Sequence, residues 1–164
     1  MTSKTVTLGN VANEVEATNH TCGYLDVALG DPAELVYGAM SELRGLQFDT
    51  MVGRGLSGSL VVPILARAMN KYFAIVRKPE ENSHSGRKLE GKLGKRWIFI
   101  DDLICLGDTF KNSAKIINET KEHMVCVGIY LYGSSTVIAS CGRKFINEAE
   151  CRSRFESVFP KEIV

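Results

Sequence analysis

The run of residues 97–109, WIFIDDLICLGDT, restricts the fold more than any other part of this sequence. It begins with four large apolar residues, which is typical of a strand buried on both faces of a parallel sheet. Two adjacent carboxylates, Asp101 and Asp102, follow without a spacer, and a short loop with one glycine, Gly107, comes next. We therefore expect the two carboxylates to lie at the carboxyl end of a buried strand.

A helix is predicted directly after this loop. Phe110, Ala114 and Ile117 recur with helical spacing, and either Asp108 or Thr109 can cap the start of the helix. Backbone N–H groups at a helix N-terminus favour a phosphate group, whereas paired carboxylates suit sugar hydroxyls or a metal ion. The alternative is an ordinary strand end with a solvated acidic pair.

The rest of the chain alternates strands with helices, which implies βαβ units and hence an α/β fold, a parallel sheet flanked by helices. Ligands of such sheets bind beyond the carboxyl ends of the strands, where the acidic pair is expected. Pro63 is expected within the first turn of its helix, where proline is tolerated. Strands are predicted at 48–52, 72–76, 97–100 and 124–131, and helices at 32–44, 60–69, 109–122 and 147–156.

Composition limits the classes of partner and of site. The 164 residues suffice for a single domain, 1–164, and the net charge of +1 predicts neither a nucleic-acid partner nor a membrane partner. The five cysteines form no C-x-x-C pair, which argues against a zinc site and a disulfide framework and favours reduced thiols in the cytoplasm. The first ten residues lack the apolar run of a signal peptide, so a cytoplasmic location is expected.

Two further segments carry candidate binding residues. Gly53-Arg54-Gly55 follows a predicted strand, and its glycines let the backbone approach a ligand closely, although a plain strand-to-helix turn is the alternative. Arg77 and Lys78 follow the next predicted strand, and residues 77–96 hold seven basic and three acidic side chains. A cationic loop suits an anionic ligand, but most charge runs only make a surface soluble.

The pattern of residues 97–109 resembles the phosphoribosyl-pyrophosphate (PRPP) signature of type I phosphoribosyltransferases. Upstream, the succession of Arg77-Lys78, Ser83-His84-Ser85-Gly86 and Leu89-Glu90-Gly91 is similar to orotate phosphoribosyltransferases, and Arg77-Lys78-Pro79 also resembles adenine phosphoribosyltransferases. The resemblance covers about residues 48–131. It implies a core at about 31–132 and a small hood from 1–30 and 133–164 that selects the base.

The resemblance implies an enzyme, a pentosyltransferase that attaches the ribose 5-phosphate of PRPP to a nitrogenous base and releases pyrophosphate. An orotate-like acceptor is favoured. The alternatives are a purine phosphoribosyltransferase and a non-catalytic, PRPP-binding regulatory domain. Mg²⁺ is the implied cofactor, and the family makes a homodimer an option for this chain.

Roles for single residues are carried over from the same resemblance. Asp101 and Asp102 are expected to hold the ribose and the Mg²⁺, and Lys78 and His84 are the other expected catalytic residues. The pyrophosphate is expected to meet Arg54, Arg77, Lys78 and His84, and the 5-phosphate is expected in loop 105–109. The expected substrate-binding residues are Arg54, Gly55, Arg77, Cys105, Leu106, Gly107, Asp108 and Thr109.

Three residues depart from the family pattern. Leu106 stands where the family has Thr or Ser, so one hydroxyl donor to the 5-phosphate is lost. Asp108 would repel a phosphate unless its carboxylate turned away to cap the helix. Cys105 replaces the Asp of 6-oxopurine enzymes, which weakens a hypoxanthine–guanine assignment.

The loop before Gly86 departs from the family pattern as well. No lysine lies between Pro79 and Gly86, so Arg87 or Lys88 would have to take the place of the loop lysine of orotate enzymes.

Overall fold

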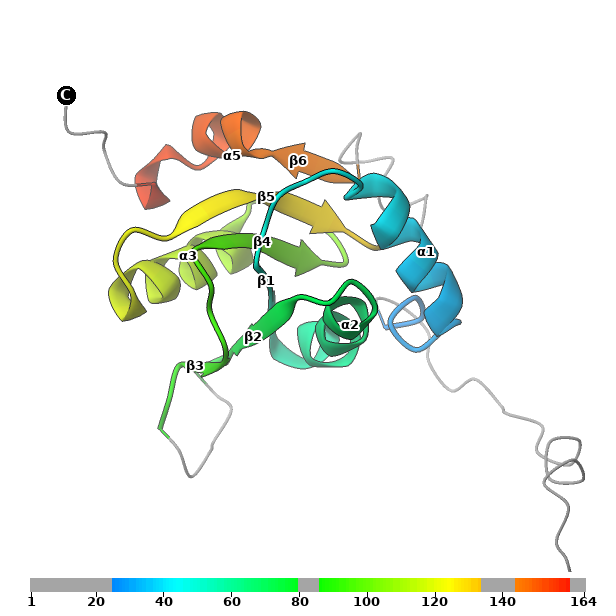
Figure 1. Ribbon diagram of the computed structural model, residues 1–164. Helices are drawn as coiled ribbons and strands as arrows, with labels where there is room; N and C mark the ends of the chain where they lie inside the picture. Colours follow the sequence, from blue (N-terminus) through cyan, green and yellow to red (C-terminus); the bar gives the residue numbers. More distant parts are fainter. Residues whose placement is uncertain (1–24, 80–85, 134–143, 160–164) are drawn as a thin grey trace, which may run out of the picture.

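The computed structural model describes residues 25–79, 86–133 and 144–159, which form a six-stranded sheet with helices on both faces (Figure 1). The elements in chain order are α1 (Pro32–Glu42), β1 (Thr50–Arg54), α2 (Gly55–Ala68), β2 (Tyr72–Val76), β3 (Leu89–Gly91), β4 (Arg96–Asp101), α3 (Asp108–Thr120), β5 (Val125–Leu131), β6 (Phe145–Asn147), α5 (Glu148–Arg154) and the 3₁₀ turn η2 (Glu156–Val158).

The strand order is β3-β2-β1-β4-β5-β6. The four central strands run parallel, and the short edge strands β3 and β6 pair antiparallel with β2 and β5. The predicted α/β class, a parallel sheet flanked by helices, is confirmed. Neither edge strand is predicted from the sequence, because three-residue strands are too short to show a period of two.

The middle of the sheet is buried on both faces, because the inner positions of β1, β4 and β5 are mostly apolar. Ile98 and Ile100 of β4 pack with α1 and α2 on one face, whereas Trp97 and Phe99 pack with α3 and α5 on the other. The ring of Phe110 lies 5.6 Å from that of Phe99 and so anchors α3 to the sheet. β4 therefore ends at a fixed point, with its carboxyl terminus directed at the start of α3.

The junction of β1 and α2 is tighter than the sequence predicts. The strand was expected at 48–52 and the helix at 60–69, but β1 ends at Arg54 and α2 begins at Gly55 without a loop. Pro63 consequently lies in the interior of α2, so its predicted place in the first turn is wrong. The apolar run marks only the part of α2 that packs on the sheet, because the first turn carries small and polar residues.

Three glycines allow this junction. Gly53 of β1 and Gly58 of α2 are in such close contact that a β-carbon at residue 53 would lie 2.8 Å from the α-carbon of Gly58 and 2.7 Å from Cγ2 of Val62. Gly55 has a positive φ of 60°, which side-chain-bearing residues rarely adopt. The chain therefore reverses from strand to helix within one residue, and Arg54 projects at the carboxyl edge of the sheet.

The helix starts differ in how well the sequence foretells them. Asp31 caps α1, since its Oδ1 accepts the N–H of Ala33 at 2.8 Å, and Pro32 occupies the first helical position as predicted.

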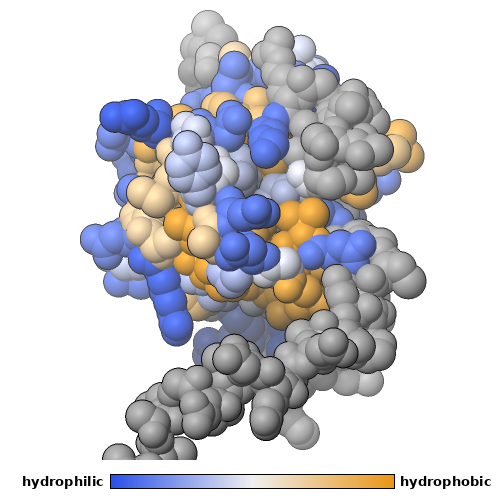
Figure 2. Space-filling model, turned by 90° about the vertical axis from the view of Figure 1, so that its right-hand side faces the viewer, coloured by the Kyte–Doolittle hydropathy of each residue, from blue (hydrophilic) through white to orange (hydrophobic). Residues whose placement is uncertain are grey.

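Among residues 25–79, 86–133 and 144–159, no helix has both the length and the hydropathy needed to cross a membrane. On the side of the molecule that carries α1, apolar and charged side chains are interspersed (Figure 2).

Candidate functional site

The predicted acidic pair and the predicted phosphate loop meet at the carboxyl end of β4. Asp101, the last residue of the strand, lines a cavity of about 260 Å³ together with residues 103–110. The cavity is closed on one side by the first turn of α3, which begins at Asp108. A carboxylate, a loop and a helix N-terminus therefore share one hollow, as the sequence predicts.

The cap of α3 differs from the prediction. Neither Asp108 nor Thr109 caps the helix, because the N-cap residue is Gly107, which has a φ of 74° in the left-handed region. Glycine is required there for a second reason, since the ring of Phe155 occupies the space that a side chain on residue 107 would need. The backbone N–H of Lys111 donates to the carbonyl of Gly107 at 2.8 Å and so closes the first turn.

Asp108 is neutralised by a neighbour on the same helix. Its Oδ1 lies 2.7 Å from Nζ of Lys111, one turn further along α3. The carboxylate therefore pairs with Lys111 instead of capping the helix. The positive charge of Lys111, rather than a capping bond, offsets the expected repulsion between Asp108 and a phosphate. Cys105, Leu106 and Thr109 are exposed around the same loop, so the hydroxyl of Thr109 and the loop backbone remain accessible to a ligand.

The pKa of the Asp101 carboxyl is raised above its ordinary value. Burial raises the pKa of its carboxyl to about 8, and the side-chain hydrogen bond and the charge of Asp102 act in the same direction. The backbone N–H of Asp102 donates to Oδ1 of Asp101 at 3.1 Å, and this bond and the positive charge of Lys78 oppose the rise. Asp101 therefore interacts electrostatically with Asp102 and with Lys78, which follows β2 in the chain.

A second, larger cavity collects most of the predicted cations. It measures about 560 Å³, and six of its eleven lining residues are lysine or arginine whereas one is acidic. Arg54, Arg77 and Lys78 reach it from the ends of β1 and β2. Its other charged or polar lining residues are Arg87, Lys88, Asn112, Lys115 and Glu119.

Arg54 is the most confined of these cations. Its Nη1 atom is buried and has no hydrogen-bond partner among the residues that the structure describes. Lys78 lies across Gly55, so closely that a β-carbon on residue 55 would lie 2.7 Å from its Cε. Lys78 lines the cationic cavity, and its charge acts on Asp101, which lines the loop cavity.

The donor set suits a magnesium ion that is shared with a ligand. Within the described residues, no group of three or more His, Cys, Asp and Glu side chains converges as a protein-made metal site would. Mg²⁺ is usually held by one or two carboxylates together with ligand phosphates and several waters. Asp101 and Asp102 provide that many carboxylates, so the residues present fit this mode of binding.

One predicted residue lies outside the described residues and three were missed. His84 belongs to segment 80–85, which the structure does not describe. Asn112, Lys115 and Glu119 of α3 line the cationic cavity but were not predicted. Their spacing of three and four residues places them on one helical face, which was the available signal. That signal is weak, because the solvated face of any surface helix has the same spacing.

Comparisons with known proteins agree with this architecture. No protein-family model matches the chain. Orotate phosphoribosyltransferase from Pyrococcus furiosus is 31% identical over 81 residues, which are 48% of this chain and 44% of that protein. The transcriptional regulator GfcR from Methanocaldococcus jannaschii is 30% identical over 84 residues, 46% of this chain and 40% of that protein. The chain thus matches less than half the length of these two curated relatives.

A solved structure extends the likeness in three dimensions. A phosphoribosyltransferase from Corynebacterium diphtheriae superposes with a TM-score of 0.53 at 20% sequence identity, covering 72% of this chain and 78% of that one. At this identity the superposition establishes the fold. Together with the sequence relatives, it confirms the resemblance to the type I phosphoribosyltransferases that the motif at 97–109 predicts.

Proposed function

We propose, from the type I phosphoribosyltransferase fold of this chain, that it binds PRPP with Mg²⁺ and transfers ribose 5-phosphate to a nitrogen of a base. The observation that supports this most is the shared cavity of Asp101 and loop 103–109, next to the cationic cavity. PRPP carries a phosphate, a ribose and a pyrophosphate in that order. The loop cavity offers a place for the phosphate, the acidic pair for the ribose and the cationic cavity for the pyrophosphate.

In the proposed complex, the N-terminal turn of α3 and the hydroxyl of Thr109 hold the 5-phosphate. Asp101 and Asp102 accept hydrogen bonds from the ribose hydroxyls and hold the magnesium, which supplies positive charge to the pyrophosphate when bound. Arg54, Arg77 and Lys78 meet the pyrophosphate, with His84 as a further candidate. Cys105, Leu106, Gly107 and Asp108 complete the loop, and Gly55 admits Lys78.

The reaction would be a displacement at C1 of the ribose, in which a base nitrogen forms the new bond and pyrophosphate leaves. The transition state has oxocarbenium character, so the acids beside the ribose and the cations beside the leaving group stabilise opposite charges. Catalysis then consists of positioning and charge stabilisation, without a covalent enzyme intermediate.

Calorimetry with PRPP and Mg²⁺ tests the binding step directly. We expect the wild-type protein to bind, and Asp101→Asn and Asp102→Asn to weaken binding about tenfold or more, as expected for the loss of a charge-assisted contact. Asp31→Asn is the matched control, because Asp31 lies at the start of α1 and lines neither cavity of the site. Equal affinity in the double Asp101/Asp102 variant and the wild type would reject the assignment.

A non-catalytic PRPP-binding regulator is the second candidate. Leu106 removes a hydroxyl from the loop and Asp108 places a carboxylate there, and both changes reduce the donors available to a phosphate. The relative from Methanocaldococcus jannaschii bears the name of a transcriptional regulator. Release of pyrophosphate from PRPP with a panel of bases separates the two candidates, because a regulator binds PRPP without turnover.

Orotate is the first acceptor to test, since the Pyrococcus furiosus relative is named an orotate phosphoribosyltransferase. Adenine and other purines form the second arm of the panel. Much of the expected hood, residues 1–24, 134–143 and 160–164, lies outside the described residues. The acceptor base is therefore to be identified by experiment. Cytoplasmic location and a homodimer stay predictions, and sedimentation of the purified protein measures the latter.

A further inference from the structure

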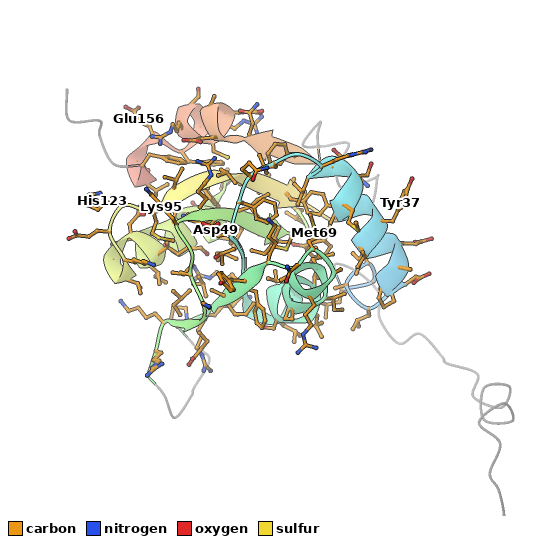
Figure 3. All side chains as sticks on the ribbon, in the orientation of Figure 1. Tyr37, Asp49, Met69, Lys95, His123 and Glu156 are labelled. Carbon is orange, nitrogen blue, oxygen red and sulfur yellow. The ribbon has the colours of Figure 1, made fainter. Side chains whose placement is uncertain are left out.

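Residues 155–159, which follow α5, pack against α3. Asn118, near the end of α3, donates through its Nδ2 to the carbonyl of Val158 at 2.9 Å. Glu156 of the same segment lies on the opposite side of the molecule from Tyr37 of α1 (Figure 3). The last described segment therefore braces α3, the helix whose first turn borders the loop cavity.

Phe155 joins this segment to the first turn of α3. Its side chain is buried, and its ring centroid lies 5.1 Å from that of Phe110. A β-carbon on Gly107 would lie 2.9 Å from Cζ of Phe155, so the ring packs directly against the backbone of the N-cap residue. Gly107 and Phe110 line the loop cavity, whereas Phe155 does not. Any effect of Phe155 on a ligand in this cavity therefore passes through those two residues.

The conformation of Gly107 sets the direction of the backbone donors at the start of α3. Among the described residues, no side chain caps this helix, and its first backbone bond runs from the N–H of Lys111 to the carbonyl of Gly107 at 2.8 Å. The N–H groups of residues 108–110 precede that bond, so they have no partner within the helix. Glycine adopts many backbone conformations, so the φ of 74° at Gly107 depends on what packs against it.

We propose that Phe155 is a positioning residue for the 5-phosphate of PRPP. Its ring holds Gly107 in the left-handed conformation and so keeps the N–H groups of the first turn of α3 directed at the loop cavity. The inference rests on the proposed function for the identity of the phosphate. Neither Phe155 nor Gly107 lines the cationic cavity, so Phe155 should not affect the binding of pyrophosphate there.

Calorimetry of Phe155→Leu with PRPP, ribose 5-phosphate and pyrophosphate, each with Mg²⁺, tests the proposal. Leucine keeps an apolar side chain in the core but withdraws the ring from Gly107. We expect PRPP and ribose 5-phosphate to bind about threefold to tenfold more weakly, the scale of one misaligned hydrogen bond, and pyrophosphate to bind as in the wild type. Phe155→Met, whose flexible side chain refills more of the space, should show the same selective loss at a smaller size.

Phe159→Leu is the matched control. Phe159 belongs to the same segment and its ring lies 6.4 Å from that of Phe110, but the three atoms nearest to a β-carbon on Gly107 all belong to Phe155. We expect this variant to bind all three ligands as the wild type does. An equal loss of PRPP affinity in Phe159→Leu and Phe155→Leu would overturn the proposal.

Two further results would overturn the role of Phe155. One is unchanged PRPP affinity in both Phe155 variants, and the other is an equal loss for PRPP and pyrophosphate, which indicates a general loss of structure. Failure of the proposed function is seen separately in the wild type. A wild-type protein that binds neither PRPP nor ribose 5-phosphate rejects the proposed function together with this inference, whereas wild-type binding without a selective loss in the variants rejects the inference alone.

Discussion

The side chain of Lys78 lies directly over the α-carbon of Gly55, with its Cε 2.7 Å from where a β-carbon on residue 55 would be. This contact ties the exit of β2 to the first residue of α2. Lys78 also lines the cationic cavity, and its charge lowers the pKa of Asp101. The absence of a side chain at residue 55 is thus a condition for the position of a charge in the site.

Gly55→Ala should therefore weaken pyrophosphate binding. The added methyl group displaces Lys78, and we expect about a tenfold loss of affinity from the loss of one charge-assisted contact. The positive φ of residue 55 adds a folding cost of about 1–2 kcal/mol. Calorimetry with pyrophosphate and urea denaturation measure the two effects. Gly45→Ala is the control, because Gly45 also has a positive φ, 81°, but nothing lies within 4 Å of its added carbon; a similar loss of binding in both variants would contradict the role of the contact.

The stability of the ligand-free protein should fall as the pH rises toward 8. The pKa of Asp101 is about 8 in the folded chain and near 4 in an unfolded one, so between these values the folded state binds the extra proton. Stability from this group is full below the unfolded pKa and is lost as the pH passes the folded pKa. Asp101→Asn removes the titration. In urea denaturation, the free energy of unfolding of this variant should therefore rise relative to that of the wild type as the pH increases from 5 to 8.5.

Asp49 provides a control of opposite sign for that experiment. Its Oδ2 accepts the N–H groups of Arg96 and Lys95 at 2.8 and 2.9 Å, and the bond from Arg96 is the main cause of its lowered pKa. A carboxylate with a lowered pKa stabilises the fold at pH values above its pKa in the unfolded chain, and this stabilisation is lost in acid. Asp49→Asn should therefore lose stability relative to wild type near neutral pH and less so near pH 3. Parallel pH curves for the wild type and Asp101→Asn would show that Asp101 titrates normally.

The carboxylate of Asp108, which pairs with Lys111, should limit the affinity of the loop for phosphate. Asp108→Asn removes a negative charge from the helix N-terminus, and we expect PRPP affinity to rise about two- to fivefold, the scale of an exposed charge interaction. The same change should cost about 0.3–1 kcal/mol of stability, because an acid in the first helical turn favours the helix dipole. Lys111→Gln leaves Asp108 unpaired and should weaken PRPP binding instead. If calorimetry finds the PRPP affinity of both variants unchanged, the Asp108–Lys111 pair does not take part in PRPP binding.

The contact between Gly53 and Gly58 should be sensitive to a single methyl group. A β-carbon on residue 58 would lie 2.8 Å from the carbonyl carbon of Gly53, and neither backbone can move without separating α2 from β1. Gly58→Ala should destabilise the fold by about 1–3 kcal/mol, as overpacking of a core does. Gly38→Ala is the control, because its added carbon would meet only the hydroxyl of Tyr130, at 3.3 Å. Equal midpoints of urea denaturation for the two variants would count against the tight junction.

The sequence predicts those parts of the fold that depend on local pattern. β2 lies at the predicted residues 72–76, since a short apolar run between polar residues is a sufficient signal for a strand. β4 and α3 also lie within one or two residues of their predicted bounds. Asp101 lies beside loop 103–109 as predicted, because strand and loop leave little freedom between Asp101 and Gly107.

The remaining features depend on contacts between distant residues. Gly107 caps α3 in place of Asp108 because Phe155, far along the chain, occupies the space above it. α2 begins before its apolar run because Gly53 and Gly58 touch, and a sequence does not show which glycines meet. Lys115 was missed because a lysine facing a cavity and one facing solvent have the same helical spacing.

The enclosed guanidinium nitrogen of Arg54 has one more consequence. A surface cation must shed its water each time it binds an anion, but this atom loses its hydration once, when the chain folds. Within the part of the chain that the structure describes, nothing pairs with this atom at the end of β1, so a bound anion would supply its hydrogen-bond acceptor. Any anion that satisfies it will raise the melting temperature in proportion to how well it fits, so thermal shift alone can rank candidate ligands before the reaction is known.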